Sequence, residues 1–451
     1  MAAKDLNVQF GRQLIAVIYL FVFVNSLAAQ KNWPEFRGPS GDGLAPEISL
    51  PTDLGDPPNV AWEIPIHGRG WSSPVIWGEQ IWLTSATEDG KKMYGICIDL
   101  KSGKVIHDKL IYENDNPRFR HATNSYASCT PVVEQGRVYL HFGSYGTACL
   151  DTSTGETIWS REDFECDHFR GPGSSPILHD DHLIVAYDGS DKQYVVAFNK
   201  ETGETAWKTD RNLEYGTDNG DWKKAYGTAS VFEIDGKPIL IYPSASATVA
   251  YNPSNGEPIW TVYHDGMNAS ARPILTQDGL VILTNGMGRM DAVNPQGSGD
   301  ITKTNIDWTI SQNVTRRPSP ILVNGNLFMF NDKGIASCVR AVDAVDGVLE
   351  AGALGMAKEG GMIRDGGALL LGGMVLLSAI LCVHAGWLDV PTDAYSTLEG
   401  ALGAVASNDT AAIASAQAES LLVPAGSLSK DWYVVFAVLS IAATLVMLLW
   451  F

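Results

Sequence analysis

Basic side chains recur immediately before short apolar runs in this chain. The segments read HGRGWSSP from His67, HFRGPGSSP from His168, NASARP from Asn268 and TRRPSP from Thr315. Guanidinium groups bind carboxylates through paired hydrogen bonds. If the segments meet on one face, they predict a site for a small anion, a carboxylate or an acidic peptide, with these candidate residues: His67, Arg69, His168, Arg170, Arg272, Arg316 and Arg317. The favoured alternative is that each arginine pairs with a neighbouring acid and ties adjacent elements together.

Other patterns that carry chemistry are weak. The acidic segments HDDH, from His179, and DNGDW, from Asp218, lack the spacing of a calcium loop and are interpreted as solvated turns. No G-x-S-x-G, H-E-x-x-H or phosphate-binding loop occurs. The sequence therefore predicts no catalytic residue and no metal ligand.

The six cysteines include no adjacent pair. Cys97 and Cys149 fill a position that alanine fills in similar segments, which indicates small core residues. A disulfide from Cys166 to Cys129 or to Cys149 is left open for an oxidising compartment.

The elements that must position the basic residues repeat about every 50 residues. Each copy predicts a strand, a turn opened by Asp or Asn and closed by Gly, and a second strand with Trp four residues after the Gly. The repeat residues are Asp99, Gly103, Asp151, Gly155, Trp159, Asn199, Gly203, Trp207, Asn252, Gly256, Trp260, Asp343 and Gly347. A Pro followed by an apolar run opens most units, so each unit is about four antiparallel strands. Such units closing radially predict an all-β propeller in which Trp packs one blade on the next.

The phrase resembles the pyrroloquinoline-quinone (PQQ)-like propeller repeat, A-x-D-x-x-[ST]-G-x-x-x-W, over about residues 33–350. The opening NWPEFRGPSGDG, from Asn32, is similar to exported bacterial members, among them scaffolds of the outer-membrane assembly lipoprotein type. The family contains enzymes and scaffolds. The resemblance implies that an enzyme would need a vicinal cysteine pair, a Ca²⁺ site and an Asp base. Because the cysteine pair is missing, no cofactor is predicted, and PQQ with calcium belongs only to the alternative of a dehydrogenase relative.

Three regions are expected. Residues 1–29 read as a secretory signal peptide, and residues 30–350 as a propeller of about six blades or an incomplete ring of seven or eight. Residues 33–66 are expected to add an outer strand to the last blade. Residues 351–451 read as an α-helical tail with two candidate membrane spans, 367–387 and 432–451. The alternative for the tail is a chimeric or frameshifted reading frame that truncates the propeller.

The formal charge of −19 disfavours nucleic acid and anionic lipid as partners. The leading hypothesis is an exported scaffold on the periplasmic face of a bacterial membrane, tethered by its tail, that binds a protein or peptide and performs no catalysis. The alternatives are a PQQ-dependent dehydrogenase relative and the mis-assembled reading frame. The oligomeric state is left open.

Overall fold

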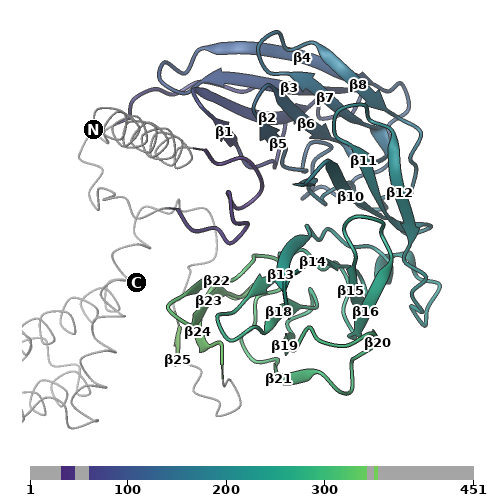
Figure 1. Cartoon of the computed structure of the whole chain (residues 1–451). Coiled ribbons are helices and arrows are strands. Elements are labelled where there is room, and N and C mark those ends of the chain that lie inside the picture. Colours follow the sequence, from purple (N-terminus) through teal and green to yellow (C-terminus); the bar gives the residue numbers. More distant parts are fainter. Residues whose placement is uncertain (1–31, 46–59, 343–349, 354–451) are drawn as a thin grey trace, which may run out of the picture. The chain divides into compact units, whose positions relative to one another are not determined.

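The computed structural model describes residues 32–45, 60–342 and 350–353 (Figure 1). These residues form six mainly antiparallel sheets, and in four of them the strands follow one another directly in the sequence. Within these ranges there is no α-helix, only two 3-10 turns at Gly143–Tyr145 and Gly220–Trp222. No helix among them is long and apolar enough to cross a bilayer. The expected signal peptide and helical tail lie outside the described residues.

Each sheet is one blade. Blade one contains β1 (Val75–Trp77), β2 (Gln80–Ala86), β3 (Lys92–Asp99) and β4 (Val105–Glu113). Blade two contains β5 (Val132–Glu134), β6 (Arg137–His141), β7 (Thr147–Asp151) and β8 (Thr157–Arg161). Blade three contains β9 (Ile177–His179), β10 (His182–Asp188), β11 (Gln193–Asn199) and β12 (Thr205–Asp210). Blade four contains β13 (Ser230–Ile234), β14 (Lys237–Pro243), β15 (Ala247–Tyr251) and β16 (Pro258–Tyr263). Blade five contains β17 (Ile274–Leu275), β18 (Val281–Thr284), β19 (Met290–Val293) and β21 (Ile306–Ile310). Blade six contains β22 (Ile321–Val323), β23 (Asn326–Phe330), β24 (Ile335–Arg340) and β25 (Glu350–Ala353).

Two blades depart from the repeat. After β19 the chain makes β20 (Gly299–Asp300), which pairs in parallel with β16 of blade four, before β21 completes blade five. This detour explains the delayed tryptophan, Trp308, that the sequence shows. Blade six still has four strands although Ala351 stands where the tryptophan would be. Its repeat residues Asp343 and Gly347 lie outside the described residues.

The repeat phrase forms the turn between the third and fourth strands, as predicted. In blade two, Asp151 Oδ1 accepts the backbone N–H of Ser153 at 2.8 Å and of Thr154 at 2.9 Å. The hydrogen bond from the Ser153 hydroxyl, followed by these two backbone hydrogen bonds, lowers the pKa of Asp151 to about 2. The N–H of Gly155 closes the turn on the Asp151 carbonyl at 2.8 Å, with φ of 68°. Asp99, Asn199 and Asn252 make the same side-chain contact with a backbone N–H at 2.8–2.9 Å.

The tryptophans join consecutive blades, which confirms that prediction. Trp159 of blade two donates its indole N–H to the carbonyl of Lys200 in blade three at 2.9 Å. A Cβ on Gly203 would lie 2.7 Å from this ring, so glycine is required there both for its φ of 73° and for space. Trp207 donates to Pro253 in blade four at 2.9 Å in the same way. The tryptophan ring of the preceding blade therefore packs directly against the turn glycine.

A line of hydrogen bonds also joins the segments that precede the first strands. The N–H of Ser73 donates to the Thr130 hydroxyl at 3.0 Å, Thr130 donates to Ser175 at 3.0 Å, and Ser175 to Thr228 at 3.1 Å. The N–H of Arg272 donates to Ser319 at 2.9 Å. Hydroxyl residues before the first strands thus link neighbouring blades, in addition to the Pro that starts most of these strands.

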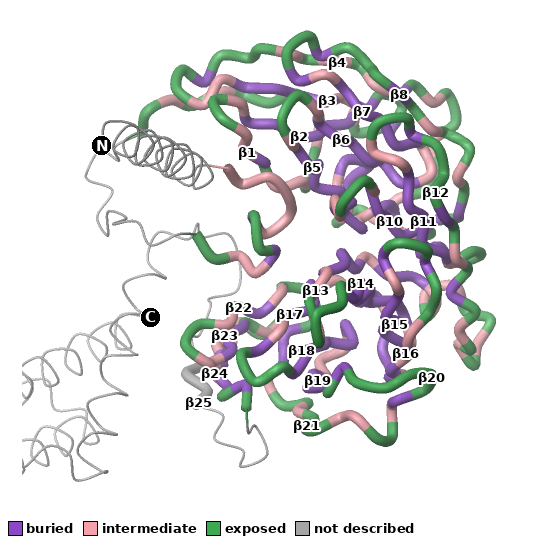
Figure 2. The backbone as a smooth tube through the Cα atoms, viewed as in Figure 1, coloured by how far each residue is buried: buried purple, intermediate pink, exposed green. Residues whose placement is uncertain are grey.

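The core is a series of layers between blades. Cys97 and Cys149 are fully buried in two of these layers, as the sequence predicts. Figure 2 shows the contrast between the buried inner strands and the fourth strands β4, β8 and β12, which are largely exposed. In these three blades the inner strands are packed between neighbouring layers and the fourth strand is left at the solvent edge.

The segment before blade one divides into two parts with different roles. Residues 32–43 lie along inner strands: Trp33 bridges Ile76 of β1 in both directions at 2.8 Å, and Pro34 accepts from Val133 of β5 at 2.8 Å. Residues 60–66 instead lay Trp62 and Ile64 against the face of blade one. The expectation of one outer strand over 33–66 is therefore wrong for its first part.

Candidate functional site

Four inter-blade loops adjoin one another and form the candidate site. They are residues 67–74, 114–131, 162–176 and 211–229, named here the loop face. The Trp71 indole donates to the Thr123 carbonyl at 3.1 Å, and the Asn124 amide donates to the Arg170 carbonyl at 2.9 Å. Arg170 in turn forms a two-pronged ion pair with Asp221, with both distances 2.8 Å. These bonds connect the first loop to the second, the second to the third and the third to the fourth.

Four of the five candidate arginines have a carboxylate partner. The pairs are Arg69 with Glu88 at 3.4 Å, Arg170 with Asp221 at 2.8 Å, Arg272 with Glu35 at 2.8 Å and Arg316 with Asp332 at 3.7 Å. Arg317 donates to the Gly286 carbonyl at 2.6 Å. His67 contacts Asp108 at 2.9 Å and is exposed. The guanidinium groups are thus engaged by the protein itself, and the structure does not bring all the candidates together on the loop face.

Arg272 holds the segment 32–43 in place. Its guanidinium, which is 4% exposed, donates to the Glu35 carboxylate at 2.8 Å, to the Phe36 carbonyl and to the Ala229 carbonyl at 2.9 Å. Arg37 of the same segment donates to the Pro320 carbonyl at 2.7 Å. Burial and the nearby Arg272 lower the pKa of Arg37 to about 10. Residues 32–43 therefore connect blades one and two with blades five and six along their inner strands.

A buried group of titratable side chains lies beneath the loop face. The N–H of Ser144 donates to His168 Nε2 at 2.9 Å, so the proton of the neutral imidazole is on Nδ1. Lys224 Nζ lies 3.3 Å from that Nδ1. Burial lowers the pKa of Lys224 and also that of His168. Lys224 is 1% exposed, and its Nζ also lies 4.5 Å from the centroid of the Tyr226 ring.

The thiol of Cys166 contacts the same imidazole at 3.6 Å. Burial raises the pKa of Cys166 to about 12, so a thiol and not a thiolate faces His168. Cys129, Cys149 and Cys166 are all free thiols, so the disulfide left open by the sequence is not formed. The pair does not have the ionisation of a cysteine nucleophile.

Exposed aromatic side chains gather on the loop face. Five Trp and Phe side chains are exposed in the described part of the chain, and four of these occur one in each loop: Trp71 (54%), Phe119 (70%), Phe169 (37%) and Trp222 (37%). Arg69 lies 4.9 Å above the Trp71 ring and Arg170 5.5 Å from that of Phe169. Sequence analysis missed this set; its signal was one large aromatic residue in each loop. Aromatic rings flanked by arginine are typical of protein-binding surfaces.

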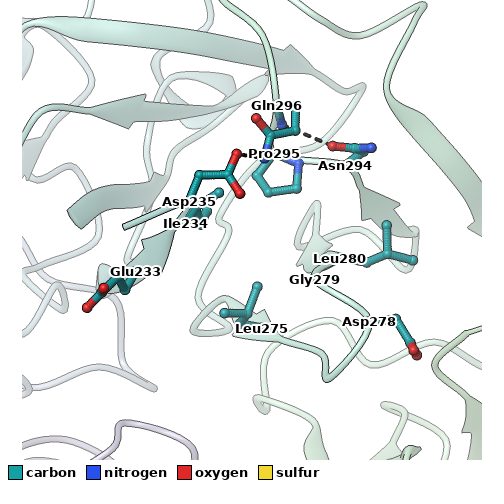
Figure 3. A pocket seen from close by; sticks show the side chains of 10 residues that line it. All are labelled: Glu233, Ile234, Asp235, Leu275, Asp278, Gly279, Leu280, Asn294, Pro295 and Gln296. Atoms are coloured by element: carbon teal, nitrogen blue, oxygen red, sulfur yellow. Dashed lines mark hydrogen bonds between the residues drawn. The ribbon is translucent and has the colours of Figure 1, made fainter. Parts of the chain in front are cut away.

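A separate pocket lies at the opposite ends of blades four and five (Figure 3). Its volume is about 320 Å³, and its lining includes the carboxylates Glu233, Asp235 and Asp278. The Gln296 amide donates to the Asp235 carboxylate at 2.7 Å, so one of these three carboxylates already has a hydrogen-bond partner. The pocket is an acidic turn cluster between two blades.

The residues do not fit a quinone held with calcium in the way that the resemblance implies. The chain has no adjacent cysteine pair. In the described ranges no three His, Cys, Asp or Glu side chains are placed to hold a metal. We therefore derive no reaction step through such a cofactor.

The repeated four-stranded blades, the turn phrase and the Trp–Gly contacts define a PQQ-like β-propeller. The family model described as "Outer membrane protein assembly factor BamB" matches residues 59–209 and 191–361, and the chain belongs to that family (PQQ_2). No curated protein matches the chain.

Several solved structures are similar to this chain at low identity. BamB from Moraxella catarrhalis is 17% identical, with 62% of this chain and 74% of that chain covered and a TM-score of 0.43. A europium-containing methanol dehydrogenase is 10% identical, with coverage of 72% and 86% and a TM-score of 0.42. The quinohemoprotein alcohol dehydrogenase from Comamonas testosteroni is 14% identical, with coverage of 70% and 58% and a TM-score of 0.45.

Proposed function

We propose that the chain is an exported, membrane-associated propeller that binds a protein or peptide partner on its loop face and performs no catalysis. The observation that carries the proposal is the set of four exposed aromatic rings on four adjoining loops. Exposed rings that cluster on one face favour an interaction site, because burying them releases more free energy than burying scattered aliphatic groups.

The backbone at one ring supports this proposal. Phe169 has a φ of 54°, a left-handed conformation that is unfavourable for a bulky side chain. It is held there because Asp167 accepts the Phe169 N–H at 2.9 Å. Strained residues of this kind concentrate at functional surfaces. The family description, an outer membrane protein assembly factor, favours a partner that takes part in the same assembly.

A photo-crosslinking residue tests the proposal. It is placed at Phe119 in the full chain, expressed in a bacterial host. The matched control carries it at Ile158, which is 43% exposed on the outer strand β8. We expect a discrete protein adduct from position 119 that is absent from position 158, and F169G or W222S should weaken it. Equal labelling from both positions would contradict the proposal. A rise in melting temperature with PQQ and Ca²⁺ would favour the dehydrogenase alternative instead.

A further inference from the structure

Residues 60–66 have the burial pattern of a fourth strand, but no described strand pairs with them. Burial alternates along them: Trp62 and Ile64 are half-buried against blade one, and Ala61, Glu63 and Pro65 are exposed. This two-residue period is that of a β-strand with one covered face. Yet none of their backbone N–H or C=O groups bonds to any residue that the structure describes.

Trp62 contacts blade one as the repeat tryptophans contact the blades that follow them. Its indole N–H donates to the Leu100 carbonyl at 3.0 Å, and a Cβ on Gly103 would lie 2.6 Å from its ring. Leu100 follows Asp99 just as Lys200, the acceptor of Trp159, follows Asn199. Residues 60–66 therefore occupy the place of the outer strand in a blade that would precede blade one.

In five blades the structure describes the ring on the fourth strand, and the third strand that pairs with it follows one rule. The ring pairs with a small residue on the third strand, and a β-bulge follows immediately; the pairs are His107 with Cys97, Trp159 with Cys149, Trp207 with Ala197, Trp260 with Ala250 and Trp308 with Ala292. An apolar residue and then Asp or Asn come next on the third strand in all five. The backbone and the ring of Trp62 thus require a specific type of neighbour.

Blade six presents the matching second surface. Ile321 and Val323 of β22 are each 36% exposed and Phe330 of β23 is 46% exposed. Leu327 and Met329 of the same blade are buried against blade five. One face of blade six is therefore packed and the other carries exposed apolar side chains, as expected for a blade that lacks its neighbour.

We propose that residues 60–66 are an acceptor edge for an extended segment donated by a partner polypeptide, antiparallel to them and of the type small–apolar–Asp/Asn, with the small residue opposite Trp62. Backbone hydrogen bonds supply the pairing, and the ring excludes a large side chain at the central position. This site uses residues other than the loop face and does not depend on the function proposed for that face.

Amide hydrogen exchange of the purified full chain tests this inference. The probe is a synthetic peptide with the sequence of residues 246–254, SATVAYNPS, which includes the third strand of blade four. The control peptide has tryptophan in place of the alanine that corresponds to Ala250. We expect fast exchange over residues 60–66 in the chain alone and at least about tenfold slower exchange with saturating probe peptide, but not with the control.

Three results would overturn the inference. Slow exchange over 60–66 before any peptide is added would mean that the chain's own residues already pair with this edge. Unchanged exchange at saturating probe would mean that the edge accepts no strand. Equal slowing by both peptides would mean that the ring of Trp62 selects nothing. W62A should abolish the effect of the probe, whereas W71A on the loop face should leave it intact.

Discussion

The variant R272M tests whether the segment 32–43 locks the propeller from within. The substitution removes the guanidinium that joins Glu35, the Phe36 carbonyl and the Ala229 carbonyl, and it leaves a carboxylate that is 15% exposed without its partner. Breaking a buried ion pair by removing one side costs about 3–5 kcal/mol. We therefore expect the free energy of unfolding of the full chain to fall by that amount.

Urea unfolding followed by tryptophan fluorescence measures the loss. E35Q keeps an oxygen that accepts from Arg272 and removes only the charge, so we expect a smaller loss of about 1–3 kcal/mol. The double variant R272M/E35Q should lose less free energy of unfolding than the sum of the two single variants, because both substitutions remove the same ion pair. The matched control is R316M: Arg316 and Asp332 are 48% and 49% exposed and 3.7 Å apart, and an exposed pair contributes about 1 kcal/mol or less. If R272M is no more destabilising than R316M, the segment does not hold the blades together.

Three further predictions concern stability. Burial lowers the pKa of His141 to about 3 and that of His264 to about 4; the unfolded chain binds these protons below about pH 6.5. The contribution of these two neutral imidazoles to the free energy of unfolding is complete above that pH. Each contribution falls by about 1.4 kcal/mol per pH unit as the pH falls toward the pKa of the folded state. An unchanged urea midpoint between pH 7 and pH 5 would contradict this prediction. W207A should cost about 3–5 kcal/mol, and W207F, which loses the 2.9 Å bond to Pro253, about 1 kcal/mol; calorimetry of the two variants decides whether the ring or its N–H matters more. In G41A the new Cβ would lie 2.4 Å from Arg272 Cζ, whereas in G136A it meets open space. Both glycines have positive φ, so both variants strain the backbone, and we expect the melting temperature to fall further in G41A. An equal fall in both variants would show that only backbone strain is involved.

The turns and the tryptophan contacts were predictable because they are local. An Asp or Asn, a Gly four residues later and a Trp four beyond that specify a turn and a ring position without reference to the rest of the chain. The role of Trp62 was harder to predict, since no turn phrase precedes it. Only its contact with Gly103 in the folded chain shows that it belongs to the same series.

The electrostatic partners were not predictable. Glu35 and Arg272 are far apart in the sequence, and no local pattern indicates that they meet. Lys224 follows Lys223 in a polar loop, which reads as a pair of solvated charges. In the structure the second lysine is 1% exposed and faces a histidine whose tautomer is fixed by Ser144. Burial of this kind depends on three loops packing together, so it appears only with the fold.

The hydroxyl line between blades has a consequence for how such chains change over time. Because the joint from Ser73 to Thr130 is the same as that from Thr130 to Ser175, a duplicated or deleted unit would find a compatible neighbour on either side. Arg272 interrupts this interchangeability, since its side chain is matched to a single segment, residues 32–43. The blade that carries Arg272 is therefore tied to one position, and units can be gained or lost only elsewhere in the series.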